Sequence, residues 1–202
     1  MEQNEQIAKI FEKSKTLFIQ EGVRNVTMEK IAKELGISKK TIYCNFENKA
    51  DLVFQSVKYD IENLENQIEH LTRSAENAIH EMQIIGNFVS KSMEKFKSSR
   101  INELENFYPK AYFQIDKHRK IFVVEKIRKN VERGIIEDLY RKDLEKEKVV
   151  LFYLTATTAL FDQKTISIEN FTISELYISY LDYHLQGILN EKGRALYSKN
   201  KR

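Results

Sequence analysis

Apolar residues recur at helical spacing along nearly the whole chain. The first such run carries on one face Ile7, Ile10, Phe11, Leu17 and Phe18. Residues three, four and seven apart share one face of an α-helix, so this run predicts an amphipathic helix. The run stops at Gly22, and glycine readily adopts the left-handed conformation in which many helices end.

Two short helices are predicted next. Thr27 has the side chain of an N-cap residue, and Gly36 interrupts the apolar pattern eight residues after the first helical position. Ser38 caps a further short helix, and Asn48 caps a long one. The apolar positions of the two short helices are Ile31, Ala32, Leu35, Ile42 and Phe46.

The rest of the chain also has helical periodicity. The long helix after Asn48 runs to a break at Ser74-Ala75, and further helices are expected near 75–98, 101–115, 117–133, 145–162 and 173–190. Gly134 is expected to end one helix and begin a connection, and the tail from Glu191 is expected to be frayed. We therefore predict an all-α protein of about nine helices, with a three-helix head at residues 1–48 and a helical body at residues 49–202.

Composition supports long helices and narrows the class of protein. The chain has one proline and six glycines in 202 residues, too few for a fold rich in tight turns. The single cysteine, Cys44, excludes an internal disulfide and a multi-cysteine metal site, and the four scattered histidines lack zinc-site spacing. The polar start, MEQNEQIAKI, does not resemble a signal peptide, and there is no apolar run of about 18 residues. We expect a cytoplasmic protein without a membrane segment or cofactor.

Charge and motifs argue against two other classes of protein. The formal net charge is only +3, with acids and bases interleaved, whereas proteins that wrap DNA without sequence choice are strongly basic. No nucleophile–base pair, phosphate loop or metal spacing indicates an enzyme.

The segment Thr27–Lys49 carries the most specific pattern. Two short helices joined by a turn at Leu35-Gly36-Ile37 match a helix-turn-helix, in which the second helix projects a polar face. If Ile42 and Phe46 face inward, the outward face carries Lys39, Lys40, Tyr43, Cys44 and Asn45. Amines suit phosphates and guanine edges, and an asparagine amide pairs with adenine.

This segment resembles the DNA-binding head of the tetracycline-repressor (TetR) family. The matching positions are Thr27, Gly36, Thr41, Ile42, Tyr43, Phe46 and Lys49. The resemblance implies phosphate contacts for Thr27, Tyr43 and Lys49, with base edges near Lys39, Lys40, Thr41 and Asn45. The predicted DNA-binding set is Thr27, Ser38, Lys39, Lys40, Thr41, Tyr43, Cys44, Asn45 and Lys49. Cys44 departs from the bulky residue usual in the family, and an alternative role for it is a redox sensor.

The body is rich in aromatic residues, which are mainly core. The resemblance implies that some of them line a cavity for a small apolar or aromatic inducer. The candidates are Phe88, Phe96, Phe107, Tyr112, Phe113, Phe122, Phe152 and Tyr153.

The last two predicted helices carry an apolar stripe broader than one packing contact needs. The resemblance favours a two-fold dimer built from them, and the alternative is the core of a monomer. The predicted interface residues are Ala156, Ala159, Leu176, Tyr177, Tyr180, Leu181, His184 and Ile188.

The combined expectation is a transcription regulator that binds a near-palindromic operator in double-stranded DNA as a homodimer. A repressor released by a small molecule is favoured over an activator. The alternative is a helical ligand-binding module whose head no longer binds DNA.

Overall fold

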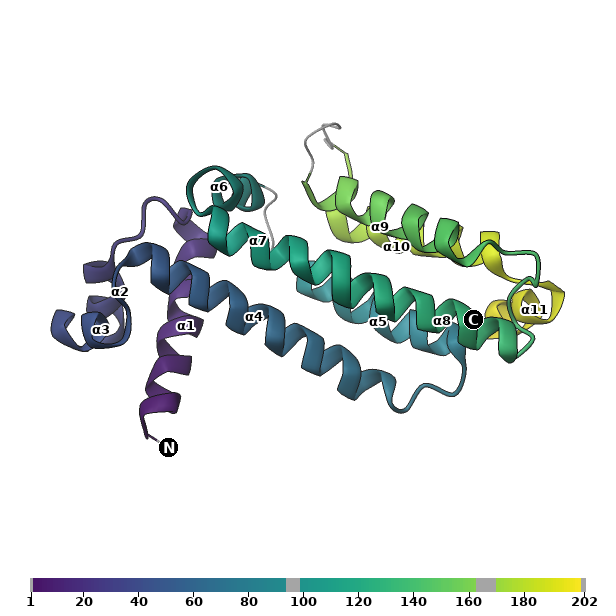
Figure 1. Ribbon diagram of the computed structural model, residues 1–202, viewed down its shortest axis with the longest axis horizontal. Coiled ribbons are helices and arrows are strands. Elements are labelled where there is room, and N and C mark those ends of the chain that lie inside the picture. Colours follow the sequence, from purple (N-terminus) through teal and green to yellow (C-terminus); the bar gives the residue numbers. More distant parts are fainter. Residues whose placement is uncertain (1, 94–98, 163–169, 201–202) are drawn as a thin grey trace. The chain divides into compact units, whose positions relative to one another are not determined.

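The computed structural model describes residues 2–93, 99–162 and 170–200, and these are almost entirely helical (Figure 1). The elements are α1 (Glu2–Glu21), α2 (Met28–Leu35), α3 (Lys39–Asn45), α4 (Lys49–Thr72), α5 (Ala78–Met93), α6 (Ser99–Phe107), α7 (Pro109–His118), the π-helical η1 (Arg119–Val123), α8 (Val124–Ile136), α9 (Lys146–Asp162), α10 (Ile173–Ile188) and α11 (Glu191–Asn200). Within the described ranges the only β-type pairing is an isolated bridge between Tyr140 and Leu189. The all-α prediction is confirmed.

The chain forms two compact units. Unit 1 comprises Met1–Leu64 and Phe96–Lys117, and unit 2 comprises Glu65–Lys95 and His118–Arg202. Unit 1 therefore holds the predicted head together with the first part of α4, α6 and most of α7. The domain boundary predicted between residues 48 and 49 stays a prediction.

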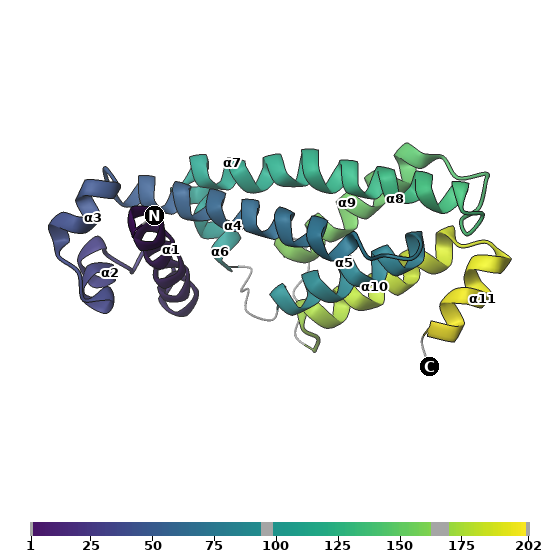
Figure 2. The same cartoon turned by 90° about the horizontal axis from the view of Figure 1, so that it is seen from below.

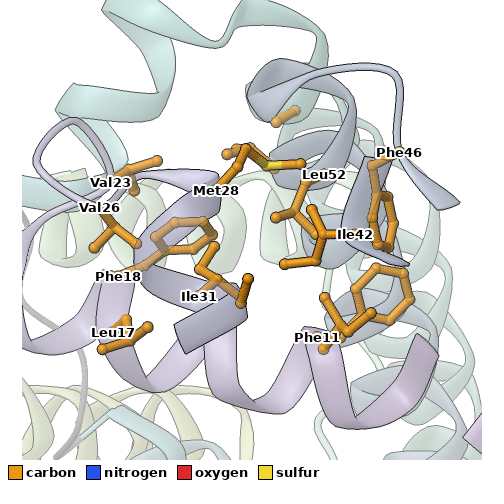
Figure 3. Packing of buried hydrophobic residues seen from close by; sticks show 14 of the residues in the cluster. Phe11, Leu17, Phe18, Val23, Val26, Met28, Ile31, Ile42, Phe46 and Leu52 are labelled. Atoms are coloured by element: carbon orange, nitrogen blue, oxygen red, sulfur yellow. The ribbon is translucent and has the colours of Figure 1, made fainter. Parts of the chain in front are cut away.

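The core of unit 1 joins the three N-terminal helices to the start of α4. Ile31, Ile42 and Leu52 are fully buried, and the rings of Phe11 and Phe46 lie 5.7 Å apart (Figure 3). An isolated helix of seven or eight residues is unstable in water. Burial of these side chains is therefore what keeps α2 and α3 folded.

The predicted caps of the short helices are confirmed. The hydroxyl of Thr27 accepts a hydrogen bond from the Lys30 amide (3.1 Å), and that of Ser38 accepts one from the Thr41 amide (3.0 Å). The side-chain oxygen Oδ1 of Asn48 accepts a hydrogen bond from the Asp51 amide in the same way at the start of α4 (3.0 Å). Gly36 ends α2 with φ +65°, the left-handed conformation that glycine adopts without steric cost. These local contacts fix where both short helices begin and where α2 ends.

Unit 2 contains α5, α8, α9 and α10, together with the end of α4, η1 and α11. Helix α5 packs against α8 and α10, and α9 packs against α8 and α10 (Figures 1 and 2). A buried polar group ties α5 to α8: the Asn130 amide donates to the Ala78 carbonyl (2.9 Å) and accepts from the Tyr140 hydroxyl (2.9 Å). Gly86 permits close approach of α5 to α10, because a Cβ there would collide with a Leu181 methyl carbon.

Three boundary predictions were wrong. Gly134 lies inside α8, which continues to Ile136, and the Tyr140 ring occupies the space that a Cβ at position 134 would need. The helix expected over 101–115 is divided at Tyr108, because Pro109 is the first residue of α7, a position where a missing N–H is harmless.

The third wrong prediction is the frayed tail, since residues Glu191–Asn200 form α11. Its one deeply buried aromatic, Tyr197, donates a hydrogen bond to the Asp182 carboxylate of α10 (2.9 Å). Gly193 lets the start of α11 approach the Leu139 carbonyl. Packing against distant residues thus orders a segment whose own pattern is weak.

Replacing Phe46 by alanine is expected to lower the free energy of unfolding by about 3–5 kcal/mol, because a fully buried aromatic ring would leave a cavity in unit 1. Urea unfolding followed by circular dichroism measures this loss. The matched control is Tyr43→Phe, which changes an exposed side chain and should leave stability within about 0.5 kcal/mol. Equal effects of the two substitutions would contradict the assignment of Phe46 to the core.

Candidate nucleic-acid interface

Helix α3 turns one face to the core of unit 1 and the opposite face to solvent. Ile42 is fully buried, whereas Lys39, Lys40, Tyr43 and Cys44 are exposed. The adjoining Thr27 and Ser38 are also exposed, and Thr41, Asn45 and Lys49 are half-buried. The structure thus gathers the predicted DNA-binding residues in unit 1, on α3 and at the starts of α2 and α4.

Part of this surface is internally hydrogen-bonded. The Ser38 and Thr41 hydroxyls lie 2.8 Å apart, and the Asn45 amide nitrogen donates to the Thr41 carbonyl (2.8 Å). Asn45 keeps its carbonyl oxygen and a second N–H, the pair of groups that reads an adenine edge. These bonds restrict the side-chain rotamers before any ligand binds.

Lys39 has a carboxylate partner that sequence reasoning missed. Its ammonium pairs with Glu29 in the first turn of α2 at 2.5 Å and lies 5.8 Å from the Tyr43 ring centre. Hydrogen bonding to Glu29 raises the pKa of Lys39, and the same bond lowers the pKa of Glu29. Glu29 is visible in the sequence only as an acid near a helix N-terminus, because its pairing depends on how α2 crosses α3.

Lys49 is engaged with the turn that precedes α2. Its ammonium donates to the Arg24 carbonyl (2.8 Å) and lies 5.9 Å from the centre of the Tyr108 ring. Partial burial lowers the pKa of Lys49, while the nearby Glu103 carboxylate opposes that shift. Two of its three N–H groups remain for other acceptors.

The aromatic residues proposed for an inducer pocket are distributed over both units. Unit 1 holds Phe107, Tyr112 and Phe113, and unit 2 holds Phe88, Phe122, Phe152 and Tyr153. Phe107, Phe113 and Phe152 are more than half exposed, and Tyr153 is fully enclosed by packing. Phe96 lies outside the described residues. The pocket stays a prediction.

An open concavity of about 660 Å³ follows the outer face of α9 and α10. Among the residues that line it are Phe152, Ala156, Ala159, Tyr180, His184 and Ile188. Five of these six belong to the predicted dimer interface, and Phe152 was assigned to the pocket instead. The other three predicted interface residues lie on α10, with Tyr177 and Leu181 buried and Leu176 half-buried.

An aromatic cluster lies beneath this concavity. The hydroxyls of Tyr153 and Tyr177 lie 2.9 Å apart, and the His184 ring packs edge-on against Tyr153 with centroids 5.2 Å apart. Burial lowers the pKa of His184 to about 4. His184 is thus held neutral among apolar rings, where a positive charge would be poorly solvated.

The two short helices α2 and α3, joined by a tight turn at Gly36 and packed on a buried core with lysines on the outer face of the second, form a helix-turn-helix. Residues 10–55 match the model of the bacterial regulatory proteins of the tetR family. This match covers the helix-turn-helix, and together with the relatives described below it supports a TetR-family transcriptional regulator.

Two regulators of Staphylococcus aureus are among its relatives. An HTH-type transcriptional regulator of strain bovine RF122 / ET3-1 is 30% identical over 104 residues, which is 48% of this chain and 56% of the relative. The chain thus spans just over half the length of that relative. A second HTH-type transcriptional regulator, from strain USA300, is 26% identical over 187 residues, covering 88% of this chain and 89% of the relative.

Solved structures share the fold at low sequence identity. A transcriptional regulator from Saccharomonospora viridis in complex with choline superimposes with TM-score 0.70 and 16% identity over 93% of this chain and 100% of that one. The regulator FadR from Bacillus subtilis in complex with stearoyl-CoA gives TM-score 0.64 and 14% identity over 90% and 98%. No helix in the described part of the chain is long and apolar enough to cross a bilayer.

The depressed pKa of His184 predicts a pH-dependent stability. An unfolded histidine titrates near 6.5, so between about pH 6.5 and 4 the unfolded chain binds a proton that the folded chain excludes. The contribution is fully present above pH 6.5 and is lost as the pH falls, by about 2 kcal/mol at pH 5.

Urea unfolding of the wild type and of His184→Gln at pH 7 and pH 5 measures this contribution. The variant should lose less stability between the two pH values than the wild type does. Identical pH dependences would show that His184 is accessible to protons in the folded chain.

Proposed function

We propose that this regulator binds a near-palindromic DNA operator as a homodimer and represses transcription until a small molecule binds. The observation that carries the proposal is the outward face of α3, where two lysines, a tyrosine and an asparagine stand above a helix fixed by buried Ile42. Such a helix presents base-reading groups to the major groove of duplex DNA.

The proposed contacts divide by chemistry. Thr27, Tyr43 and Lys49 are proposed to bind phosphate oxygens, since Thr27 and Lys49 flank α3 at the starts of α2 and α4 and Tyr43 is exposed on α3 itself. Lys39, Lys40, Thr41 and Asn45 are proposed to lie at base edges, with Ser38 and Cys44 exposed beside them. Because Lys39 is paired with Glu29, its full use by a base or phosphate requires it to leave that carboxylate.

A homodimer is supported by the concave apolar face of α9 and α10. Small side chains at Ala156 and Ala159 permit close helix approach, and Phe152 and Tyr183 are mostly exposed apolar surface in the single chain. A two-fold dimer through this face would form a four-helix bundle. Its two heads would enter successive major grooves roughly 34–36 Å apart.

Release by a small molecule is supported by the ligands of two fold relatives, choline and stearoyl-CoA. For this chain we propose an apolar or aromatic inducer bound among body aromatics. A ligand that favours the DNA-incompatible state by about 1–3 kcal/mol lowers operator affinity 5- to 150-fold. An increase of transcription with the regulator present would instead identify an activator.

DNA binding is tested by selecting duplexes from a random-sequence library and measuring affinity against salt. Lys49→Ala should weaken binding to selected and random duplexes alike and reduce the salt slope by about one, because one phosphate contact is lost. Asn45→Ala should reduce the preference for selected duplexes by about 1–3 kcal/mol at one base pair.

The control variant is Lys58→Ala, which removes a lysine paired with Glu62 on α4 outside the proposed contacts. An equal loss on selected and random duplexes for Asn45→Ala would contradict base reading. Absence of duplex binding by the wild type would identify the head as degenerate.

The dimer is tested by Ala159→Glu, which places a carboxylate in the concavity on each side of the two-fold axis. The expected result is at least a ten-fold rise in the dimer dissociation constant, about 1.4 kcal/mol, measured by analytical ultracentrifugation. Ile136→Glu, at a side chain 84% exposed on α8, is the matched control and should leave the dimer intact. A monomeric wild type, or a dimer unaffected by Ala159→Glu, would exclude this interface.

A further inference from the structure

The turn between α1 and α2 is held by a residue far away in sequence. The Glu103 carboxylate of α6 accepts hydrogen bonds from two consecutive backbone amides, those of Val23 (2.9 Å) and Arg24 (2.7 Å). Gly22, at φ +86°, lies directly beside it: a Cβ there would be 3.4 Å from a Glu103 oxygen. One carboxylate thus accepts hydrogen bonds from two backbone amides that lie outside any helix.

The same turn is held from its other side by α4. The Lys49 ammonium donates to the Arg24 carbonyl (2.8 Å), so charged side chains from α6 and α4 bind the N–H and C=O of one residue. The Arg24 guanidinium also lies 4.1 Å from the centre of the Phe107 ring of α6. Charge-assisted hydrogen bonds are about twice as strong as neutral ones, and all these contacts lie within unit 1.

The position of this turn gives it a consequence for DNA binding. Three residues after Arg24 comes Thr27, the cap of α2, and the turn also holds the Lys49 ammonium; both are proposed phosphate contacts. The two contacts therefore share one support. That support is completed by Glu103, which lies outside residues 10–55 that match the family's head.

We propose that Glu103 is a positioning residue for DNA binding: by fixing the α1–α2 turn, it presents Thr27 and Lys49 to phosphates in register with α3. The proposal rests on the proposed DNA-binding function and adds a residue of α6 to it. Glu103 itself bears a negative charge and does not contact phosphate. Its effect is to raise the fraction of chains whose head is competent to bind.

The direction of the effect separates positioning from simple charge. Removing a carboxylate from unit 1 makes the unit more positive, which by itself tightens DNA binding. Loss of positioning weakens it, because apparent affinity falls with the fraction of competent chains. Glu103→Gln also places an amide N–H₂ against one of the two backbone N–H donors. The matched control is Glu62→Gln, which removes the same charge from an exposed pair with Lys58 on α4.

The experiment measures binding of full-length wild type, E103Q and E62Q to a labelled 40-base-pair random duplex and to a duplex selected by the wild type. We expect E103Q to bind both roughly ten-fold more weakly, and E62Q to bind as the wild type or slightly more tightly. Hydrogen exchange of the Val23 and Arg24 amides should accelerate in E103Q and stay unchanged in E62Q. If E103Q is unfolded at the assay temperature, Glu103→Asp replaces it, since aspartate keeps the charge but is one methylene shorter.

Each result decides the proposal. Affinity of E103Q equal to or above that of E62Q overturns it, and so does weakened binding without faster exchange at the turn. Strong binding by the wild type and E62Q keeps the proposed function standing even when Glu103 fails its test. Absence of DNA binding by the wild type refutes the proposed function and this role together, whatever the exchange rates show.

Discussion

Burial of Ile42 and Phe46 is the constraint on which the proposed DNA-binding surface depends. Helix α3 has seven residues and cannot hold its shape alone, so these two contacts with the head core fix its position and rotation. Rotation is the important quantity, because it decides that Lys39, Lys40 and Tyr43 face away from the core. Apolar packing on the inner side of α3 therefore determines which polar side chains the helix exposes on its outer side.

Two cationic side chains of this surface already have partners in the free protein. Lys39 is paired with Glu29, and Lys49 is bound to the Arg24 carbonyl. In the proposed complex, the free energy of duplex binding is the gain from phosphate or base contacts minus the cost of the internal contacts that are given up. The pairing of Lys39 with Glu29 opposes the proposed DNA binding, because the lysine has to leave that carboxylate first.

The features that sequence reasoning predicted are local. Thr27, Ser38 and Asn48 cap helices through bonds to residues three positions away, so their side chains alone indicate where helices begin. The contacts that escaped prediction join distant segments: Glu103 binds amides about 80 residues earlier, and Tyr197 orders α11 by contact with α10. The helix end predicted at Gly134 was wrong for the same reason. The glycine makes room for the Tyr140 ring and does not end a helix. Which aromatics would face the proposed inducer depends on such long-range packing.

The separation of buried and exposed residues in α3 also affects how the target sequence of such a regulator can change in evolution. Of its seven residues only Ile42 is buried, and the helix is otherwise anchored by Phe46 and its cap. Exposed positions such as Lys40 and Cys44 can therefore exchange side chains at little cost to folding. After gene duplication, a copy could drift toward a new target site through viable intermediates. The shortness of α3, which makes it depend on its neighbours for shape, leaves its outer face open to evolutionary change.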